Sequence, residues 1–214
     1  MAAMKTYIYI DGFNFYYGAV KKTKYKWLDL KKLFKNLLDP KHDIIAIKYF
    51  TALVSGKLDP NQPIRQKTYL RALKTHIPEI EIIYGQFTTH TIISPLSHNL
   101  PEYKDRMFYV PVLKTEEKGS DVNLAVHLLN DAWQNKFDCA VVVSNDSDLA
   151  EALKFVSQQN HKLIGIINPR PKKQPAKELM LYANFYKQIR EGVLKASQLP
   201  DPIPGTTLHK PKSW

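Results

Sequence analysis

Apolar residues along the chain follow two spacings, one typical of buried strands and the other typical of amphipathic helices. Short, nearly continuous apolar runs predict strands at residues 6–11, 43–54, 79–87, 137–143 and 162–168. Segments with apolar residues three or four positions apart predict helices at residues 27–38, 61–76, 120–135, 148–160 and 176–189. Strands that alternate with helices form right-handed βαβ units. The sequence therefore predicts an α/β fold with a central, mostly parallel sheet flanked by helices on both faces.

Two parts of the chain depart from this alternation. We expect residues 88–93 and 107–119 to form a hairpin. Pro111 has no N–H to donate to a neighbouring strand, so it favours an edge position, and we expect the hairpin to extend one edge of the sheet. The last twenty residues contain four prolines, Pro200, Pro202, Pro204 and Pro211. We therefore expect residues 5–190 to form one domain and residues 191–214 to form a Pro-rich tail, which is packed over the surface or partly disordered.

The composition adds a surplus of positive charge. Lys and Arg number 31 against 20 Asp and Glu, a net charge of +11. This surplus favours a polyanionic partner, nucleic acid before an anionic membrane surface, although a solvated basic surface has the same composition. No apolar run reaches the roughly 18–20 residues of a membrane span, and the first residues lack a signal peptide's apolar centre. The only cysteine, Cys139, cannot form an internal disulfide, so we expect a cytoplasmic protein without membrane partners.

Aspartates stand where predicted strands end and helices begin. Asp11 follows the first strand, and Asp146 and Asp148 follow the strand "CAVVV". Asp121 lies at the start of the helix predicted at 120–135. In an open parallel sheet, binding sites form at the carboxyl ends of the strands. We therefore expect these four aspartates to converge at one edge of the sheet.

Each aspartate also has a purely structural interpretation. Asp148 with Glu151 fits a capping box at the start of the helix predicted at 148–160. Asp121 or Ser120 likewise fits the N-cap of the helix predicted at 120–135. Asp11 with the glycine after it fits the turn of a tight hairpin. Capping accounts for single aspartates, but it does not explain why every predicted strand end on one edge carries one. Asp146 has the weakest structural interpretation, because one helix needs one cap.

A cluster of carboxylates needs positive charge among them, since like charges repel. Oxygen ligands without an accompanying set of His and Cys suit Mg²⁺ or Mn²⁺, which orient phosphate oxygens and lower the pKa of bound water. Lys118, three residues before Asp121, is a candidate for binding a phosphate oxygen, although a solvated lysine fits this position equally well. Four polar residues are candidates for supporting the carboxylates or metal-bound waters: Asn14, Ser144, Asn145 and Ser147. The sequence has no glycine-rich phosphate loop, and no Ser–His or Cys–His pair stands out.

Three segments resemble a known family when they are taken in order. "YIYIDGFNFYYG", "EEKGSDVNLAVHLL" and "FDCAVVVSNDSDLAEAL" are similar to motifs of the NYN domain family, specifically the LabA/DUF88 branch of the PIN-like nuclease superfamily. The resemblance covers about residues 5–168. It implies a Rossmann-like, PIN-type three-layer fold and an acidic pocket that binds Mg²⁺ or Mn²⁺ and hydrolyses phosphodiester bonds, usually in RNA. It also implies the catalytic, metal-binding residues, which are Asp11, Asp121, Asp146 and Asp148, with Asn14 supporting the first.

An acidic pocket needs a basic surface beside it to hold a nucleic acid. Two segments combine basic residues in a suitable way, one of them interleaved with aromatic residues that suit single-stranded RNA. Their candidate contacts are Lys22, Lys24, Arg170, Lys172 and Lys173. Solvated loops would have the same composition.

Three functions remain open from the sequence. The first is a metal-dependent ribonuclease in which a cluster of aspartates holds the metal that activates water. The second is a non-catalytic, regulatory module that binds nucleic acid and keeps a vestigial metal site. The third is a phosphatase or nucleotide hydrolase that acts on small substrates. The sequence leaves homo-oligomerisation open.

Overall fold

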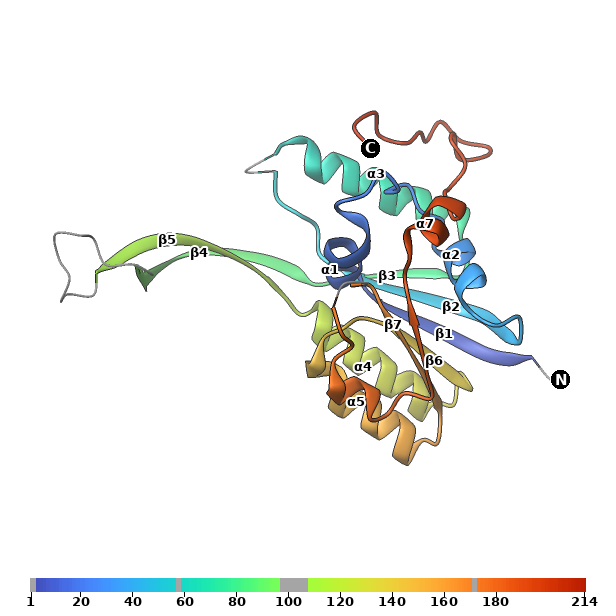
Figure 1. The fold of residues 1–214 in the computed structure, drawn as a ribbon. Helices are drawn as coiled ribbons and strands as arrows, with labels where there is room; N and C mark the ends of the chain where they lie inside the picture. The colour runs from blue at the N-terminus through green and yellow to red at the C-terminus, as the bar shows by residue number, and fades with distance from the viewer. Residues whose placement is uncertain (1–2, 57–58, 97–107, 171–172) are drawn as a thin grey trace.

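The computed structural model describes residues 3–56, 59–96, 108–170 and 173–214. At its centre, six strands form a sheet in the order β3-β2-β1-β6-β7-β8, and every neighbouring pair is parallel (Figure 1). The strands are β1 (Met4–Asp11), β2 (His42–Thr51), β3 (Ile80–Tyr84), β6 (Cys139–Val143), β7 (Leu163–Asn168) and β8 (Phe185–Gln188). This arrangement confirms the predicted α/β fold with a parallel central sheet.

The register of the sheet brings the ends of its central strands to one edge. Asp11, the last residue of β1, pairs with Phe50 of β2, and Ile10 pairs with Val143 of β6. Ser144 is the first residue after β6. Because carboxyl ends of parallel strands share an edge, the segments that follow β1, β2, β6 and β7 meet there.

Helices cover both faces of the sheet and give the molecule three layers (Figure 1). One face carries α1 (Gly12–Phe15), the π-helical turn η1 (Tyr16–Val20), α2 (Leu30–Leu37), α3 (Asn61–His76) and α7 (Glu191–Ala196). The opposite face carries α4 (Ser120–Trp133), the 3-10 turn η2 (Ser147–Leu149), α5 (Ala150–Lys154), the π-helical turn η3 (Phe155–Gln159) and α6 (Lys177–Met180). The alternation of β1 explains both contacts, since Ile8 and Ile10 pack on the first face and Tyr9 on the second.

The C-terminal segment packs against the face that carries α3. Trp27 donates its indole N–H to the carbonyl of Pro200 at 3.0 Å, and Leu199 and Ile203 are buried. The ring of Trp214 lies edge-on to that of Tyr69 with 5.8 Å between centroids. Residues after α7 therefore complete this part of the core.

No helix among the described residues combines the length and apolar character that crossing a membrane requires.

The predicted hairpin forms, but it does not extend the sheet. β4 (Gln86–Pro95) and β5 (Tyr109–Lys118) pair only with each other and form an antiparallel arm that projects from the body (Figure 1). The chain leaves the sheet at Gly85, whose N–H donates to the carbonyl of Thr51 at 2.7 Å. Phe87 then packs edge-on to Phe13 with 5.6 Å between centroids. This contact fixes the base of the arm beside the first residues of α1.

The predicted helix at 176–189 is wrong over most of its length. Only α6 is helical, and residues 185–188 form β8 at the edge of the sheet. Asn184 starts this strand, because its N–H donates to the carbonyl of Ile164 and its side-chain oxygen accepts from the N–H of Ile164, both at 2.7 Å. The ring of Phe185 lies across Gly165. These tertiary contacts outweigh the helical spacing of the apolar residues.

A buried charge network ties α4 to the sheet below the edge where β1 ends. Asp131 is 1% exposed and accepts hydrogen bonds from Tyr9, Lys48 and Lys136. Burial alone raises the pKa of Asp131, but the three hydrogen bonds outweigh it and hold that pKa below its ordinary value. Because a buried charge without partners is strongly destabilising, this network fixes α4 on β1 and β2.

We expect Gly165→Ala to destabilise the fold by about 1–3 kcal/mol, since added atoms in a packed core force shifts of their neighbours. A Cβ at this position would lie 2.1 Å from the ring of Phe185. The matched control is Gly192→Ala in α7, where a Cβ meets nothing within 4 Å and alanine favours the helix. Chemical denaturation measures both, and equal midpoints for the two variants would contradict the packing described for β8.

Candidate acidic site at the strand ends

The side chain of Asp11 occupies the edge of the sheet between β1 and β6. Its Oδ1 accepts the backbone N–H of Asn14 at 2.9 Å, and so Asp11 caps α1. Its Oδ2 accepts the hydroxyl of Ser144 at 2.9 Å. The helix starts directly after β1 because Gly12 has no side chain, and a Cβ there would lie 2.5 Å from the carbonyl oxygen of Phe50. The carboxylate is therefore held by two donors from two different strand ends.

Ser144 connects Asp11 to the second predicted acid. The Ser144 hydroxyl oxygen accepts the N–H of Asp146 at 3.1 Å while it donates to Asp11. Asp146 in turn accepts the N–H of Asp148 at 3.1 Å and caps the short turn η2. The capping role considered as the structural alternative for Asp148 thus belongs to Asp146, and the Asp148 side chain is exposed. Asp146 serves the local fold and stands in the cluster at the same time.

Asp11 lies close enough to two other carboxylates for their charges to change its pKa. Burial raises the pKa of Asp11 above its ordinary value, and the charges of Asp146 and Asp121 raise it further. The hydrogen bonds from Asn14 and Ser144 lower that pKa in part. Three of the four predicted acids thus share one electrostatic environment, although they are far apart in sequence.

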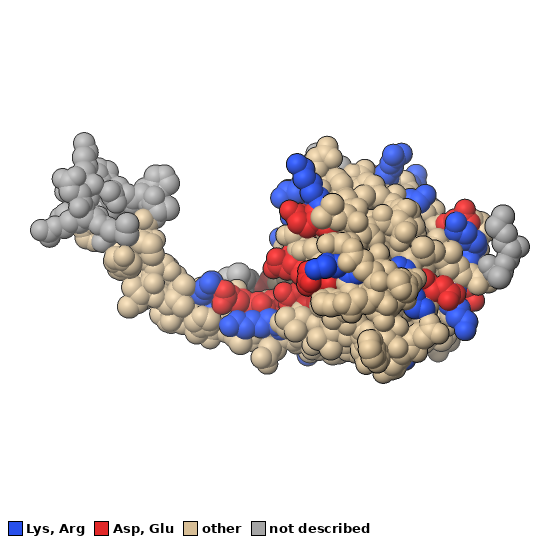
Figure 2. All heavy atoms as spheres, turned by 90° about the horizontal axis from the view of Figure 1, so that it is seen from below, with Lys and Arg blue, Asp and Glu red and all other residues tan. Residues whose placement is uncertain are grey.

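Asp121 reaches this environment from the first turn of α4. Glu117 accepts hydrogen bonds from the N–H and the hydroxyl of Ser120, at 3.1 and 2.8 Å, and so satisfies the start of the helix. Gly119 adopts φ +92°, a left-handed conformation that other residues rarely adopt, and turns the chain from β5 into α4. Since Glu117 takes this role, the carboxylate of Asp121 accepts, among the described residues, only the adjacent N–H of Val122 at 2.8 Å. Asp and Glu side chains gather where the arm joins the body (Figure 2).

The chemistry of this cluster fits a hard divalent cation. Its donors are oxygens, its charges are negative, and a cation would relieve the repulsion that raises the pKa of Asp11. The side-chain oxygen of Asn14 is buried beside the cluster and has no hydrogen-bond partner among the described residues. In the described part of the chain, no three His, Cys, Asp or Glu side chains are already close enough to enclose an ion. The fit therefore rests on donor type, charge and this unpaired oxygen.

The other predicted supporting residues lie around the cluster without touching Asp11. Asn145 accepts the N–H of Ala176 at 2.9 Å and donates to the carbonyl of Gln174 at 3.2 Å, so it holds the segment before α6. Ser147 and Lys118 are exposed, and neither side chain makes a hydrogen bond to the described residues. Asn14 supports Asp11 through its backbone N–H, where the sequence suggested its side chain.

The two predicted basic segments meet at η1. A Cβ at Gly18 would lie 2.8 Å from the side chain of Arg170, which shows how closely the segment after β7 packs on η1. Lys22 and Lys24 are exposed just beyond this turn, and Lys173 is exposed on the other segment. Lys172, also predicted as a nucleic-acid contact, lies outside the described residues. The two segments thus lie against each other next to the strand end that carries Asp11.

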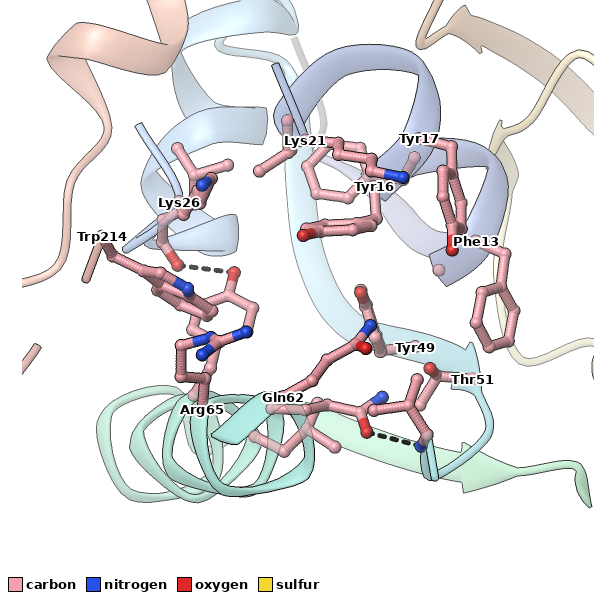
Figure 3. A pocket seen from close by; sticks show the side chains of 18 residues that line it. Phe13, Tyr16, Tyr17, Lys21, Lys26, Tyr49, Thr51, Gln62, Arg65 and Trp214 are labelled. Carbon is pink, nitrogen blue, oxygen red and sulfur yellow. Dashed lines mark hydrogen bonds between the residues drawn. The ribbon is translucent and has the colours of Figure 1, made fainter. Parts of the chain in front are cut away.

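A pocket of about 330 Å³ lies on the α3 side of α1 (Figure 3). Its wall combines aromatic rings with basic and amide side chains from α1, η1, β2 and α3 and from the C-terminal residue. Sequence reasoning did not point to Tyr49, Arg65 or Trp214. No sequence signal connects these residues, because they come from segments far apart that only the fold brings together.

Three comparisons place this chain among known proteins. The model of the NYN domain family matches residues 5–189. The chain is 34% identical, over an alignment 239 positions long, to a Pseudomonas putida protein named 6-hydroxy-3-succinoylpyridine 3-monooxygenase HspA, and the match covers 99% of this chain and 75% of that protein. A solved structure from Vibrio parahaemolyticus, of a protein of unknown function, is similar with a TM-score of 0.54 and 16% identity. That match covers 88% of this chain and 94% of the other, and it supports the fold alone.

The raised pKa of Asp11 predicts how the protein responds to removal of this charge. In EDTA at pH 7, we expect Asp11→Asn to melt at a higher temperature than the wild type, because a raised pKa means that ionised Asp11 disfavours the folded state. Each 1 kcal/mol corresponds to about 2–4 °C in a protein of this size. The difference should shrink as pH falls through the raised pKa toward the ordinary value of 3.8.

The control is Asp43→Asn, at the start of β2 on the opposite edge of the sheet, where the carboxylate is exposed. This variant should melt with the wild type at every pH. Lower stability of Asp11→Asn at pH 7, or a difference that does not change with pH, would contradict the electrostatic description of the cluster.

Proposed function

This chain belongs to the NYN domain family, and from that premise we propose that it is a metal-dependent ribonuclease of the LabA/DUF88 branch. The observation that carries the proposal is the shared environment of Asp11, Asp121 and Asp146 at one edge of the sheet. The proposed cofactor is Mg²⁺ or Mn²⁺, and the proposed substrate is single-stranded RNA. Asp148, exposed at the same turn, would contribute from the rim.

The chain's own residues supply a fixed set of oxygen ligands. Asp11 and Asp146 would hold the metal with Asp121, and Ser144 keeps the first two in a constant relation through its two hydrogen bonds. The unpaired oxygen of Asn14 would accept from a metal-bound water. When bound, such an ion supplies charge neutralisation at the phosphate and a lowered pKa for a coordinated water.

The substrate strand would lie on the basic surface beside these ligands. Lys22, Lys24, Arg170 and Lys173 offer positive charge on the side of η1, and Lys118 offers it at the end of β5. Phosphate contacts of this kind position a strand without reading its sequence. The only thiol, that of Cys139, is buried inside β6, and burial raises its pKa to about 12, so it is not available as a nucleophile.

We expect the purified protein to cleave labelled single-stranded RNA with Mn²⁺ or Mg²⁺ and not with EDTA. Asp11→Asn and Asp146→Asn should lower the rate by more than the roughly 10–100-fold typical of lost supporting contacts, because they remove ligands. Ser144→Ala should fall within that range, because it removes only the residue that positions both aspartates. Gel analysis of RNA, single-stranded DNA and duplexes side by side measures rate and substrate preference.

Asp43→Asn serves as the matched control and should retain full activity. Cleavage that survives EDTA or both aspartate substitutions would contradict the metal mechanism. RNA binding without cleavage under any metal would favour a non-catalytic module. Phosphate release from mononucleotides but not from polymers would favour a small-substrate hydrolase.

The Pseudomonas putida relative supports a second candidate, a monooxygenase that acts on a small heteroaromatic acid. Its name describes such an activity, and the similarity extends over nearly the whole of this chain. The pocket of aromatic and basic residues beside α1 has a composition that suits a ring with an anionic group. A monooxygenase inserts one atom of O₂ and reduces the other to water with two electrons from a donor, so this candidate requires a co-substrate.

Oxygen uptake distinguishes this second candidate. The protein is incubated with 6-hydroxy-3-succinoylpyridine and a reduced nicotinamide, and an oxygen electrode records consumption. Uptake that depends on both compounds and falls in Arg65→Gln, but not in Arg71→Gln on the same helix, would support it. No uptake, together with metal-dependent RNA cleavage, leaves the ribonuclease as the function.

A further inference from the structure

The pocket beside α1 adjoins the acidic cluster directly. Gly12 and Phe13, which follow Asp11 in the chain, form part of the pocket wall. Tyr49 forms another part, and burial and then the charge of Asp11 raise the pKa of its hydroxyl. β1, which ends at Asp11, and β2, which carries Tyr49, are neighbours in the sheet, so the two sites adjoin along its edge. A ligand of modest length can therefore occupy both.

The electrostatics of the pocket are opposite to those of the cluster. Lys21, Lys26 and Arg65 line it, and none of its lining residues, all of which the structure describes, is acidic. Arg65 also pairs with Asp59, which lies outside the lining, so Lys21 and Lys26 carry the charge of this wall that no described acid pairs with. Lys21 also belongs to the basic segment after η1, and its ammonium lies 4.5 Å from the ring centroid of Tyr17. The positive wall of the pocket is thus continuous with the surface that would hold a strand. An anionic group is favoured at this wall and disfavoured at the metal-free cluster.

Aromatic rings provide the rest of the wall. Tyr16 and Tyr49 lie next to each other on one side of the pocket, and Trp214 lies across from them (Figure 3). Trp214 is itself held by edge-on contacts with Trp27 and Tyr69, at 6.5 and 5.8 Å between centroids. Nucleobases stack on such rings whatever their sequence. The volume of about 330 Å³ lies at the small end of ligand sites and suits a single nucleotide.

Polar groups that point into this space are free to bind a ligand. The side chains of Gln62, Thr51 and Tyr16 make no hydrogen bond to any described residue, whereas Gln66 and Tyr69 are fully committed to backbone groups. Figure 3 shows the amide of Gln62 and the hydroxyl of Tyr16 directed toward the middle of the pocket. An amide pairs with the edge of a base as both donor and acceptor. The pocket thus offers faces for a ring and hydrogen-bonding groups for its edge.

From these observations we infer that the pocket binds one unstacked nucleobase of the strand, together with the phosphate next to it. The aromatic rings would stack on the base, Gln62 and Thr51 would meet its edge, and Arg65 with Lys26 would meet the phosphate. This inference rests on the proposed nuclease function, and it adds a position where the strand is held beside the scissile bond. It also explains why basic residues converge so close to an acidic site.

Binding of mononucleotides without metal tests the pocket separately from catalysis. With EDTA present, isothermal titration should give an affinity for adenosine 5′-monophosphate at least about tenfold above that for ribose 5-phosphate, since only the nucleotide has a ring to stack. Arg65→Gln and Gln62→Leu should each weaken the nucleotide by about fivefold or more. Gln62 makes no side-chain hydrogen bond to the described residues, so its replacement leaves the fold unchanged. Arg71→Gln on the same helix is the matched control and should bind as the wild type does.

Equal affinities for the nucleotide and the sugar phosphate would overturn the inference. The same holds if Arg65→Gln and Arg71→Gln bind alike, or if benzoate displaces the nucleotide with equal affinity. Asp11→Asn separates the two proposals, because it should abolish cleavage while metal-free nucleotide binding persists. Cleavage of RNA with unchanged binding in the pocket variants would leave the nuclease standing and reject the pocket. Nucleotide binding in the pocket without RNA cleavage would do the reverse.

Discussion

A half-buried carboxylate at the end of β1 sets the constraint on which the rest of the site depends. Asp11 is held by the N–H of Asn14 and the hydroxyl of Ser144, yet burial and two neighbouring carboxylates raise its pKa. A fold optimised only for stability would avoid this arrangement, because clustered negative charges repel. A cation bound there would offset this repulsion. The chain as a whole carries a net charge of +11, which would attract the polyanion that such a cation is proposed to act on.

The parallel sheet explains why three different surfaces meet at one edge. β1 and β6 bring the carboxylates, the segment after β7 brings Arg170 against η1, and β2 with α3 brings the aromatic pocket. Each surface is unremarkable alone. Side by side, they would offer ligands for the proposed metal, a basic surface for a nucleic-acid backbone and a pocket for one base. The buried Asp131 network anchors α4 behind this edge and so fixes the direction from which Asp121 approaches.

Periodicity was sufficient to predict the fold and the place of the acids, since apolar spacing and parallel topology together determine which loops meet. It failed for residues 176–189, where Asn184 and Phe185 form strand contacts with β7 that helical spacing does not reveal. The sequence also left a capping role open for Asp148, because it does not show that Ser144 turns the chain and leaves Asp146 at the cap position. The sequence could not predict the pocket, because only tertiary packing brings Tyr49, Arg65 and Trp214 together.

The central claim is that Asp11, Asp121 and Asp146 together form one catalytic metal site. Iron-directed cleavage of the protein tests it most directly. Fe²⁺ is loaded in place of Mg²⁺, ascorbate and peroxide generate radicals at the bound ion, and mass spectrometry locates the backbone cuts. Cuts are predicted near residues 11–14, 119–122 and 144–148, and they should disappear with excess Mg²⁺ or in Asp11→Asn. Cuts that cluster elsewhere, or that persist unchanged in that variant, would contradict the account.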